Sequence, residues 1–183
     1  MTNRVTATII LMTAMLMDLM DSTITNVALP AISTDLGATP TQLEWTLVGY
    51  VVAFATLLIT GGRLGDIYGR KRIFLVGVIG FTCASVFASL AWSGNALITA
   101  RIIQGAFAGV MVPQVLSSVQ VMYAPEERGP VFGIIGSLNA LGVITGLLLG
   151  GWLVTANLFG TGWRSIFLIN VPVGIVLTVM AFL

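Results

Sequence analysis

The chain has 183 residues, of which 57% are hydrophobic and only 8% are charged. A typical soluble domain has roughly 25% charged residues, so eight basic and seven acidic side chains are too few to cover a water-soluble fold of this size. The net charge of +1 argues against nucleic acid as a partner, and the absence of histidine with a single cysteine excludes disulfides within the chain and nearly all zinc chemistry.

Six apolar segments follow one another along the chain, each close to the roughly 20 residues that a membrane-spanning helix needs. The first is too long for the apolar part of a signal peptide, and no break between segments is long enough for a soluble domain. Lipid cannot satisfy exposed backbone groups, so the segments must be helices. The sequence predicts an all-α membrane protein, a bundle of six transmembrane helices. Their expected bounds are residues 5–32, 43–62, 73–92, 96–122, 131–155 and 163–183.

The basic residues predict the orientation of these helices. If the amino terminus lies in the cytoplasm, the inner segments hold six basic residues and the outer loops hold none, with Arg164 just after the last loop. This asymmetry favours a multi-pass protein of the plasma membrane. The six are Arg4, Arg63, Arg70, Lys71, Arg72 and Arg128. Four tryptophans are expected in an aromatic belt at the outer ends: Trp45, Trp92, Trp152 and Trp163.

Three charged residues lie inside predicted spans, where each costs roughly 2.5–3.5 kcal/mol to insert. Asp18 and Asp21 are in the first span and share a helix face, and Arg101 is in the fourth. An aspartate and an arginine on facing helices would lower this cost for each other. Arginine stays protonated, so only a carboxylate could exchange a proton, as a proton-coupled carrier requires. The alternative is that the pair only locks two helices together.

The segment between the second and third spans, residues 61–72, reads GGRLGDIYGRKR. Its basic residues alone would be a topology signal, but Asp66 adds nothing to that signal. Glycines at 62, 65 and 69 allow a tight turn and close approach of another helix. The pattern favours a latch between moving helices.

Glycines recur every four residues in the fifth span, which predicts a smooth face for close helix packing. The fourth span has a shorter pattern of the same kind. These glycines are Gly142, Gly146 and Gly150, with Gly151 beside them, and Gly105 and Gly109 in the fourth span.

Five motifs, in order, resemble the first six spans of the major facilitator superfamily, and more narrowly the fourteen-span drug:proton antiporter family 2. They are MDSTITNVALP at 20–30, GGRLGDIYGRKR at 61–72, RIIQG at 101–105, GVITGLLLGG at 142–151 and WRSIFLINVPVG at 163–174. The resemblance implies that residues 1–183 are the amino-terminal half of a carrier whose carboxyl-terminal half is absent.

The resemblance also implies roles for individual residues. Asp21 and Arg101 would couple proton movement to transport. The inner conformational gate would consist of Gly62, Asp66, Gly69 and Arg70, and the antiporter glycines would be Gly142, Gly146, Gly150 and Gly151. Leu147 stands where the antiporter motif has proline, so the proline bend is absent, and Asp18 has no counterpart in the family motif.

The expected function is proton-coupled efflux of small amphipathic compounds or drugs, with the proton gradient as energy source and no cofactor or metal. The partners would be the cargo, protons, the lipid bilayer and a second half. An alternative is a truncated, non-transporting six-helix protein, or a half-carrier that needs a partner. An enzyme is not expected, because no set of nucleophile and base is visible.

Overall fold

The computed structural model describes residues 4–157 and 160–182, and nearly all of them are helical. The elements are α1 (Arg4–Leu36), α2 (Pro40–Tyr68), α3 (Arg70–Ser89), α4 (Gly94–Met122), α5 (Pro125–Ala156), the 3₁₀ turn η2 (Gly162–Arg164), α6 (Ser165–Leu168) and α7 (Asn170–Phe182). Counting η2, α6 and α7 as one stretch, the described residues form six helices long and apolar enough to cross a membrane. The prediction of an all-α, six-span bundle is confirmed.

The helices extend further than the predicted spans. The 33 residues of α1 measure about 50 Å, which exceeds the roughly 30 Å of the hydrocarbon core. Polar residues that were predicted to lie in loops therefore continue the helices. The largest change is at residues 63–72, where α2 runs to Tyr68 and α3 begins at Arg70. Gly69 alone separates them. Its φ is 95°, a backbone angle that residues with a side chain rarely adopt.

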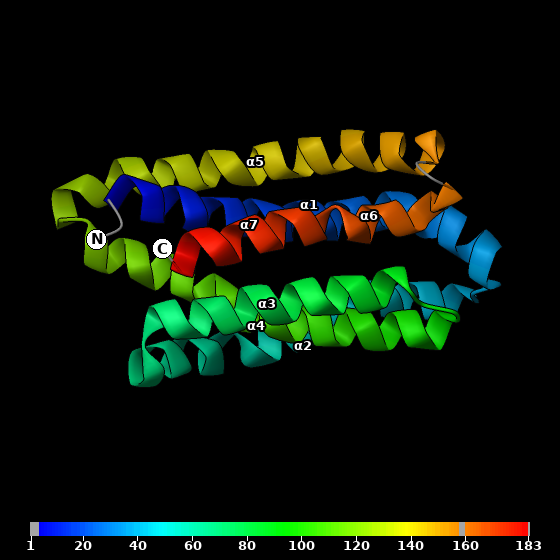
Figure 1. Cartoon of the computed structure of the whole chain (residues 1–183), viewed down its shortest axis with the longest axis horizontal. Coiled ribbons are helices and arrows are strands. Elements are labelled where there is room, and N and C mark those ends of the chain that lie inside the picture. Colours follow the sequence, from blue (N-terminus) through cyan, green and yellow to red (C-terminus); the bar gives the residue numbers. More distant parts are fainter. Residues whose placement is uncertain (1–3, 158–159, 183) are drawn as a thin grey trace.

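Helix α4 is central to one part of the bundle, because it packs against both α2 and α3. On the other side α1 packs along α5, and α7 joins the two parts through contacts with α3 and α1. Figure 1 shows α5 along one edge, α1 and α6–α7 in the middle, and α2, α3 and α4 together on the other side. Consecutive helices are therefore not always neighbours, and residues far apart in sequence meet in the centre.

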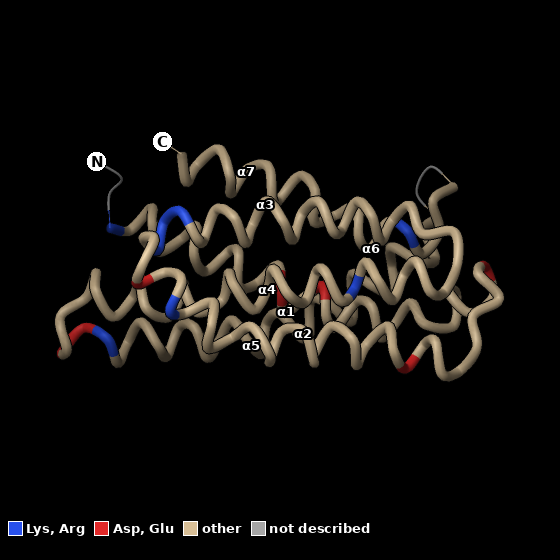
Figure 2. Tube along the Cα trace, turned by 90° about the horizontal axis from the view of Figure 1, so that it is seen from below, with Lys and Arg blue, Asp and Glu red and all other residues tan. Residues whose placement is uncertain are grey.

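The predicted inner basic residues gather at one end of the bundle, which we call the basic end (Figure 2). Both described termini, Arg4 and Phe182, lie at this end (Figure 1). The opposite end holds the α1–α2 and α3–α4 connections and η2.

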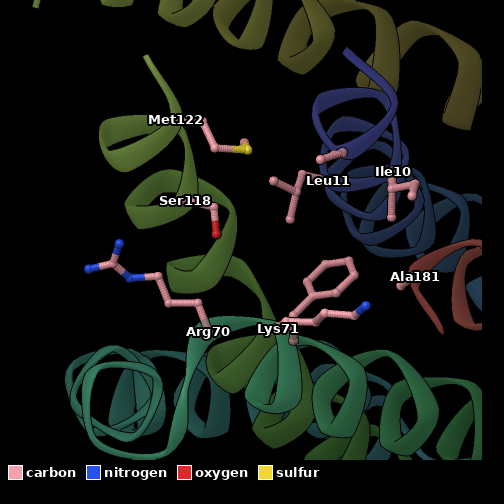
Figure 3. Close-up of a pocket in the computed structure, with 9 residues that line it drawn as sticks. Ile10, Leu11, Arg70, Lys71, Ser118, Met122 and Ala181 are labelled. Carbon is pink, nitrogen blue, oxygen red and sulfur yellow. The ribbon is translucent and has the colours of Figure 1, made fainter. Parts of the chain in front are cut away.

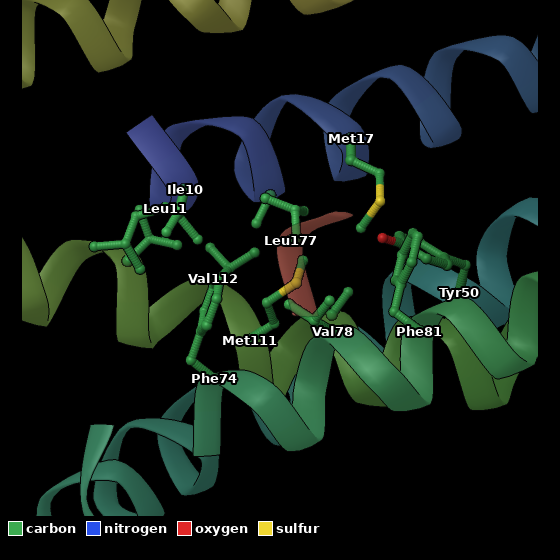
Figure 4. Close-up of a cluster of buried hydrophobic side chains, with 13 residues drawn as sticks. Ile10, Leu11, Met17, Tyr50, Phe74, Val78, Phe81, Met111, Val112 and Leu177 are labelled. Atoms are coloured by element: carbon green, nitrogen blue, oxygen red, sulfur yellow. The ribbon is translucent and has the colours of Figure 1, made fainter. Parts of the chain in front are cut away.

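The apolar core has two main clusters along the bundle axis. One lies towards the basic end and includes Ile10, Phe74, Met111 and Leu177 (Figure 4). The other lies towards the opposite end and combines residues of α1, α3, α4, α5 and α6, with Ile24 and Phe167 among them. Polar side chains of α1 and α4 occupy the layer between the two clusters.

The predicted glycine faces of α4 and α5 lie where α4 approaches α2 and where α5 approaches α1. Added Cβ atoms at Gly105 and Gly109 would collide with the backbone of α2, at the carbonyl oxygens of Tyr50 and Phe54. The glycines of α5 approach α1 in the same way: a Cβ at Gly146 would lie 2.8 Å from Cβ of Thr23.

Gly142 and Gly150 also face α1, but an added Cβ at Gly151 would meet nothing within 4 Å. Gly151 is therefore not part of the packing face. The one cysteine of the chain, Cys83, is exposed on α3.

Candidate functional site

An ion pair between α1 and α4 lies at the centre of the bundle. Arg101 Nη1 is 2.5 Å from Asp21 Oδ2, and both side chains are 1% exposed. The two residues predicted from sequence to lower each other's cost of burial are thus in direct contact. They are buried by this bundle itself, so the pair does not need another domain to shield it from solvent.

The carboxylate of Asp21 accepts two further hydrogen bonds from side-chain amides. Gln104 Nε2 donates to Oδ1 over 2.9 Å, and Asn170 Nδ2 of α7 donates to the same oxygen over 2.6 Å. Both amides also donate to the hydroxyl of Ser85 on α3, at 2.9 and 3.3 Å. Three helices therefore meet at this carboxylate, α3 joins them through Ser85, and each carboxylate oxygen has an N–H donor.

Arg101 is fixed by more than its ion pair. Its Nη1 also donates to Gln104 Oε1 over 2.6 Å, and its Nε donates to the backbone carbonyl of Thr46 over 3.3 Å. The guanidinium lies 4.2 Å from the ring centre of Tyr50 and 5.8 Å from that of Phe167. A planar guanidinium with a fixed set of donors suits this site, and a lysine ammonium could not make the same contacts.

The second intramembrane carboxylate, Asp18, is held differently. Its Oδ1 accepts a hydrogen bond from the hydroxyl of Tyr50 on α2. Tyr50 thus contacts Asp18 with its hydroxyl and Arg101 with the face of its ring. Asp18 and Asp21 are not equivalent: the first has a phenol as its partner, and the second has a guanidinium and two amides.

Sequence reasoning found Asp18, Asp21 and Arg101 but did not identify the rest of this centre. Gln104 appeared there only as part of the RIIQG motif at 101–105. The signal that could have found the others is the same for each: a polar side chain in an otherwise apolar span. The residues missed are Tyr50, Ser85 and Asn170.

The predicted gate lies at the basic end, where α2 meets α3. Arg70 Nη2 is 3.0 Å from Asp66 Oδ1, and Arg70 Nη1 donates to the backbone carbonyl of Ser117 on α4 over 3.3 Å. Asp66 therefore pairs with a side chain of the next helix. Gly69 supplies the turn between them, and a Cβ added at Gly62 would lie 3.7 Å from Cβ of Pro113, an ordinary van der Waals distance.

Gln114 links α4 to α2 by a hydrogen bond close to the predicted gate residues. Its Nε2 donates to the carbonyl of Gly61 over 2.7 Å. Its Oε1 lies against Gly65 and is the buried side-chain acceptor without a hydrogen-bond partner in the described part of the chain. A side chain at position 65 would collide with this amide, which explains why glycine suits the position.

A small pocket of about 180 Å³ opens at the basic end between α1, α3, α4 and α7. Figure 3 shows Lys71 extending across it towards Ala181, while Arg70 turns away. Most of its other lining residues are apolar, such as Leu11 and Met122. The pocket lies beside the gate and away from the Asp21–Arg101 pair.

At the opposite end, Asp35 joins the end of α1 to η2. Its Oδ2 is 2.6 Å from Arg164 Nη1 and accepts a hydrogen bond from Trp163 Nε1 over 2.9 Å. Trp163 is 2% exposed and packs edge-on against Phe167. Its predicted place in a lipid-facing aromatic belt is therefore wrong, whereas Trp45, Trp92 and Trp152 are exposed.

These observations define a polytopic helical membrane protein with a buried ion-pair centre. The sequence matches the Major Facilitator Superfamily over residues 11–183, and the chain belongs to that superfamily. Among solved structures, the inward-open xylose transporter XylE from E. coli aligns with 98% of this chain and 47% of its own, with a TM-score of 0.78 and 15% identity. XylE bound to a glucose derivative gives a TM-score of 0.80 at 14% identity. Together they establish a six-helix, amino-terminal major facilitator bundle.

Curated relatives have higher sequence identity. A probable actinorhodin transporter of Streptomyces coelicolor is 49% identical over 95% of this chain and 30% of its own length. A cephamycin export protein of Amycolatopsis lactamdurans is 41% identical over 93% of this chain and 34% of its own length. A puromycin resistance protein of Streptomyces alboniger is 38% identical over 91% of this chain and 33% of its own length. The chain thus spans about a third of the length of these relatives.

Proposed function

We propose that the chain is the amino-terminal half of an exporter that moves small amphipathic compounds out of the cell in exchange for protons. The observation that carries the proposal is the buried Asp21–Arg101 pair, with its amide ligands from α4 and α7. Export is supported by the names of the relatives, which describe antibiotic transport, export or resistance. In carriers of this kind the cargo site lies between two halves, so a second half is needed to complete it.

Proton coupling is supported by the chemistry of the centre. A buried carboxylate can change charge, and the guanidinium beside it cannot. A change in the charge of this centre would alter the ion pair of Asp21 with Arg101 and the hydrogen bonds that Gln104 and Asn170 donate to Asp21. Because these donors come from α4 and α7, a change at Asp21 reaches the packing of three helices at once.

The gate residues provide a site where movement between helices could be controlled. The contacts of Arg70 with Asp66 and with the Ser117 carbonyl tie the α2–α3 turn to α4. Asp66 remains largely exposed, so it can exchange its partner when helices move. The glycines at 142, 146 and 150 would let α5 slide against α1 without interlocking side chains.

We propose that the basic end faces the cytoplasm and that the protein lies in the plasma membrane with its amino terminus inside. Six basic residues lie at that end, and cytoplasmic loops carry such an excess. The exposed tryptophans Trp45, Trp92 and Trp152 lie towards the other end, as an interfacial belt would require.

The test uses the complete reading frame that contains this chain, expressed in cells that lack their own exporters. Retention of a fluorescent amphipathic dye is measured with and without a protonophore. The expected result is dye efflux that the protonophore abolishes. Efflux that continues after collapse of the proton gradient would contradict proton coupling.

The matched variants are Asp21→Asn and Glu44→Gln, each of which removes one carboxylate charge. Asp21→Asn is expected to abolish proton-driven efflux while the protein remains in the membrane. Glu44 is exposed on α2 and outside the centre, so Glu44→Gln is expected to export at the wild-type rate. Wild-type efflux by Asp21→Asn would overturn the role of Asp21.

A further inference from the structure

The buried centre holds two carboxylates and one permanent cation. Asp18 and Asp21 come from α1, and Arg101 comes from α4. Tyr50 of α2 is the other ionisable group that faces them. The charged residues of α3 and α5 lie at the basic end, and the described residues of α6 and α7 include none. If both carboxylates were ionised, the centre would carry an uncompensated negative charge away from water.

The hydrogen-bond partners of the two carboxylates differ, and those of Asp21 favour the ionised form. Asp21 accepts N–H donors on both oxygens, from Arg101, Gln104 and Asn170. The orientation of the Gln104 amide is set independently, because its Oε1 accepts from Arg101. Its Nε2 must therefore point at Asp21. A protonated Asp21 would place a hydrogen among donors and find no acceptor, so the arrangement fits the carboxylate form.

Asp18 has the opposite surroundings. Its bonded partner in the described structure is the Tyr50 hydroxyl, which can donate or accept a hydrogen bond. Among the residues that the structure describes, no guanidinium or amide donates to it. It also remains 8% exposed, compared with 2% for Asp21, so it is the more accessible of the two. A neutral Asp18 carries its proton on Oδ2, so its Oδ1 still accepts the hydrogen bond from Tyr50.

We infer that Asp18 holds the exchangeable proton of this centre, while Asp21 is the ionised partner of Arg101. This inference rests on the proposed function, in which the centre couples proton movement to transport. Release of the proton to water converts the acid of Asp18 to a carboxylate and changes the centre from neutral to a single negative charge. Tyr50 transmits this change, because its hydroxyl contacts Asp18 and its ring covers Arg101.

Infrared spectroscopy of the whole protein that carries this chain, reconstituted in lipid vesicles, tests the inference without transport. A protonated carboxyl group gives a carbonyl stretch that disappears when the proton is released. The wild type is expected to show such a band, which titrates as the pH is raised. Asp18→Asn is expected to remove it. Asp21→Asn is also expected to remove it, because Asp18 would then become the counter-ion of Arg101.

Two variants at the hydrogen-bond partners therefore decide which acid carries the proton. Tyr50→Phe removes the hydroxyl at Asp18 and keeps the ring over Arg101, so it should shift the frequency of the band. Asn170→Ala removes a donor to Asp21 and should leave the frequency unchanged. A shift with Asn170→Ala and none with Tyr50→Phe would overturn the inference, as would a wild type without any titrating carboxyl band. Because no cargo is used, failure of the efflux assay would not affect this result.

Discussion

Arg101 Nη1 and Asp21 Oδ2 lie 2.5 Å apart although 80 residues separate them in the sequence. The contact joins α1 to α4 inside a bundle in which those helices otherwise touch little, since α4 packs mainly on α2 and α3. Removing one member of such a pair leaves an uncompensated buried charge, which costs about 3–5 kcal/mol.

Arg101→Ala is therefore expected to lower the free energy of unfolding by about 3–5 kcal/mol. The exposed Arg63→Ala on α2 should change it by less than about 0.5 kcal/mol. Denaturant unfolding in detergent, followed by helical circular dichroism, measures both.

The double variant Arg101→Ala with Asp21→Asn removes both charges of the same pair. It should be less destabilised than the sum of the single variants, because contacting residues are not additive. Additive effects would mean that the two side chains do not interact in the membrane-embedded protein.

Asp66→Ala is expected to slow efflux by the complete carrier without unfolding it. Asp66 is largely exposed and bonds to Arg70 four residues away, and such a pair contributes only about 0.3–0.5 kcal/mol. Turnover should therefore fall while the thermal midpoint changes little. Vesicle efflux rates and a thermal melt of the same preparation provide the comparison. Unchanged turnover would reduce the motif to a topology signal.

Gly146 and Gly151 on α5 are expected to respond oppositely to alanine. A Cβ at Gly146 would come within 2.8 Å of Thr23 Cβ, so Gly146→Ala should force α1 and α5 apart and cost about 1–3 kcal/mol. Gly151 faces open space, and alanine there should be neutral or stabilise the helix by about 0.5–1 kcal/mol. Thermal melts of the two variants test the contact. Equal loss of stability would contradict the packing of α5 on α1.

Trp163 and Trp152 test the distinction between a buried and a lipid-facing tryptophan. Trp163 is enclosed between Asp35 and Phe167, so Trp163→Ala should cost about 3–5 kcal/mol. Trp152 is exposed on α5, and Trp152→Ala should cost much less. Quenching of tryptophan fluorescence by a lipid-attached quencher gives a second measurement. Trp163 should be protected, and strong quenching at this position would place it in the belt that the sequence predicted.

The sequence alone determined the number, type and order of the membrane helices. Hydropathy is a local property, so six apolar segments can be read without knowing how they pack. The same holds for the cost of burying Asp18, Asp21 and Arg101, which required a partner or a water-filled space wherever the helices lay. Helix ends were less well predicted, because helix geometry continued through polar residues such as those before Tyr68.

Only the tertiary structure decided which residues meet. Contact depends on the rotation of each helix about its axis, and apolar residues on all sides of a span leave that rotation undetermined. This is why Asn170 and Ser85 were missed, although each is a polar residue in an apolar segment. Helix rotation also explains why Gly146 packs against α1 whereas Gly151 faces open space. It likewise explains why Asp21 contacts a guanidinium whereas Asp18 contacts a phenol.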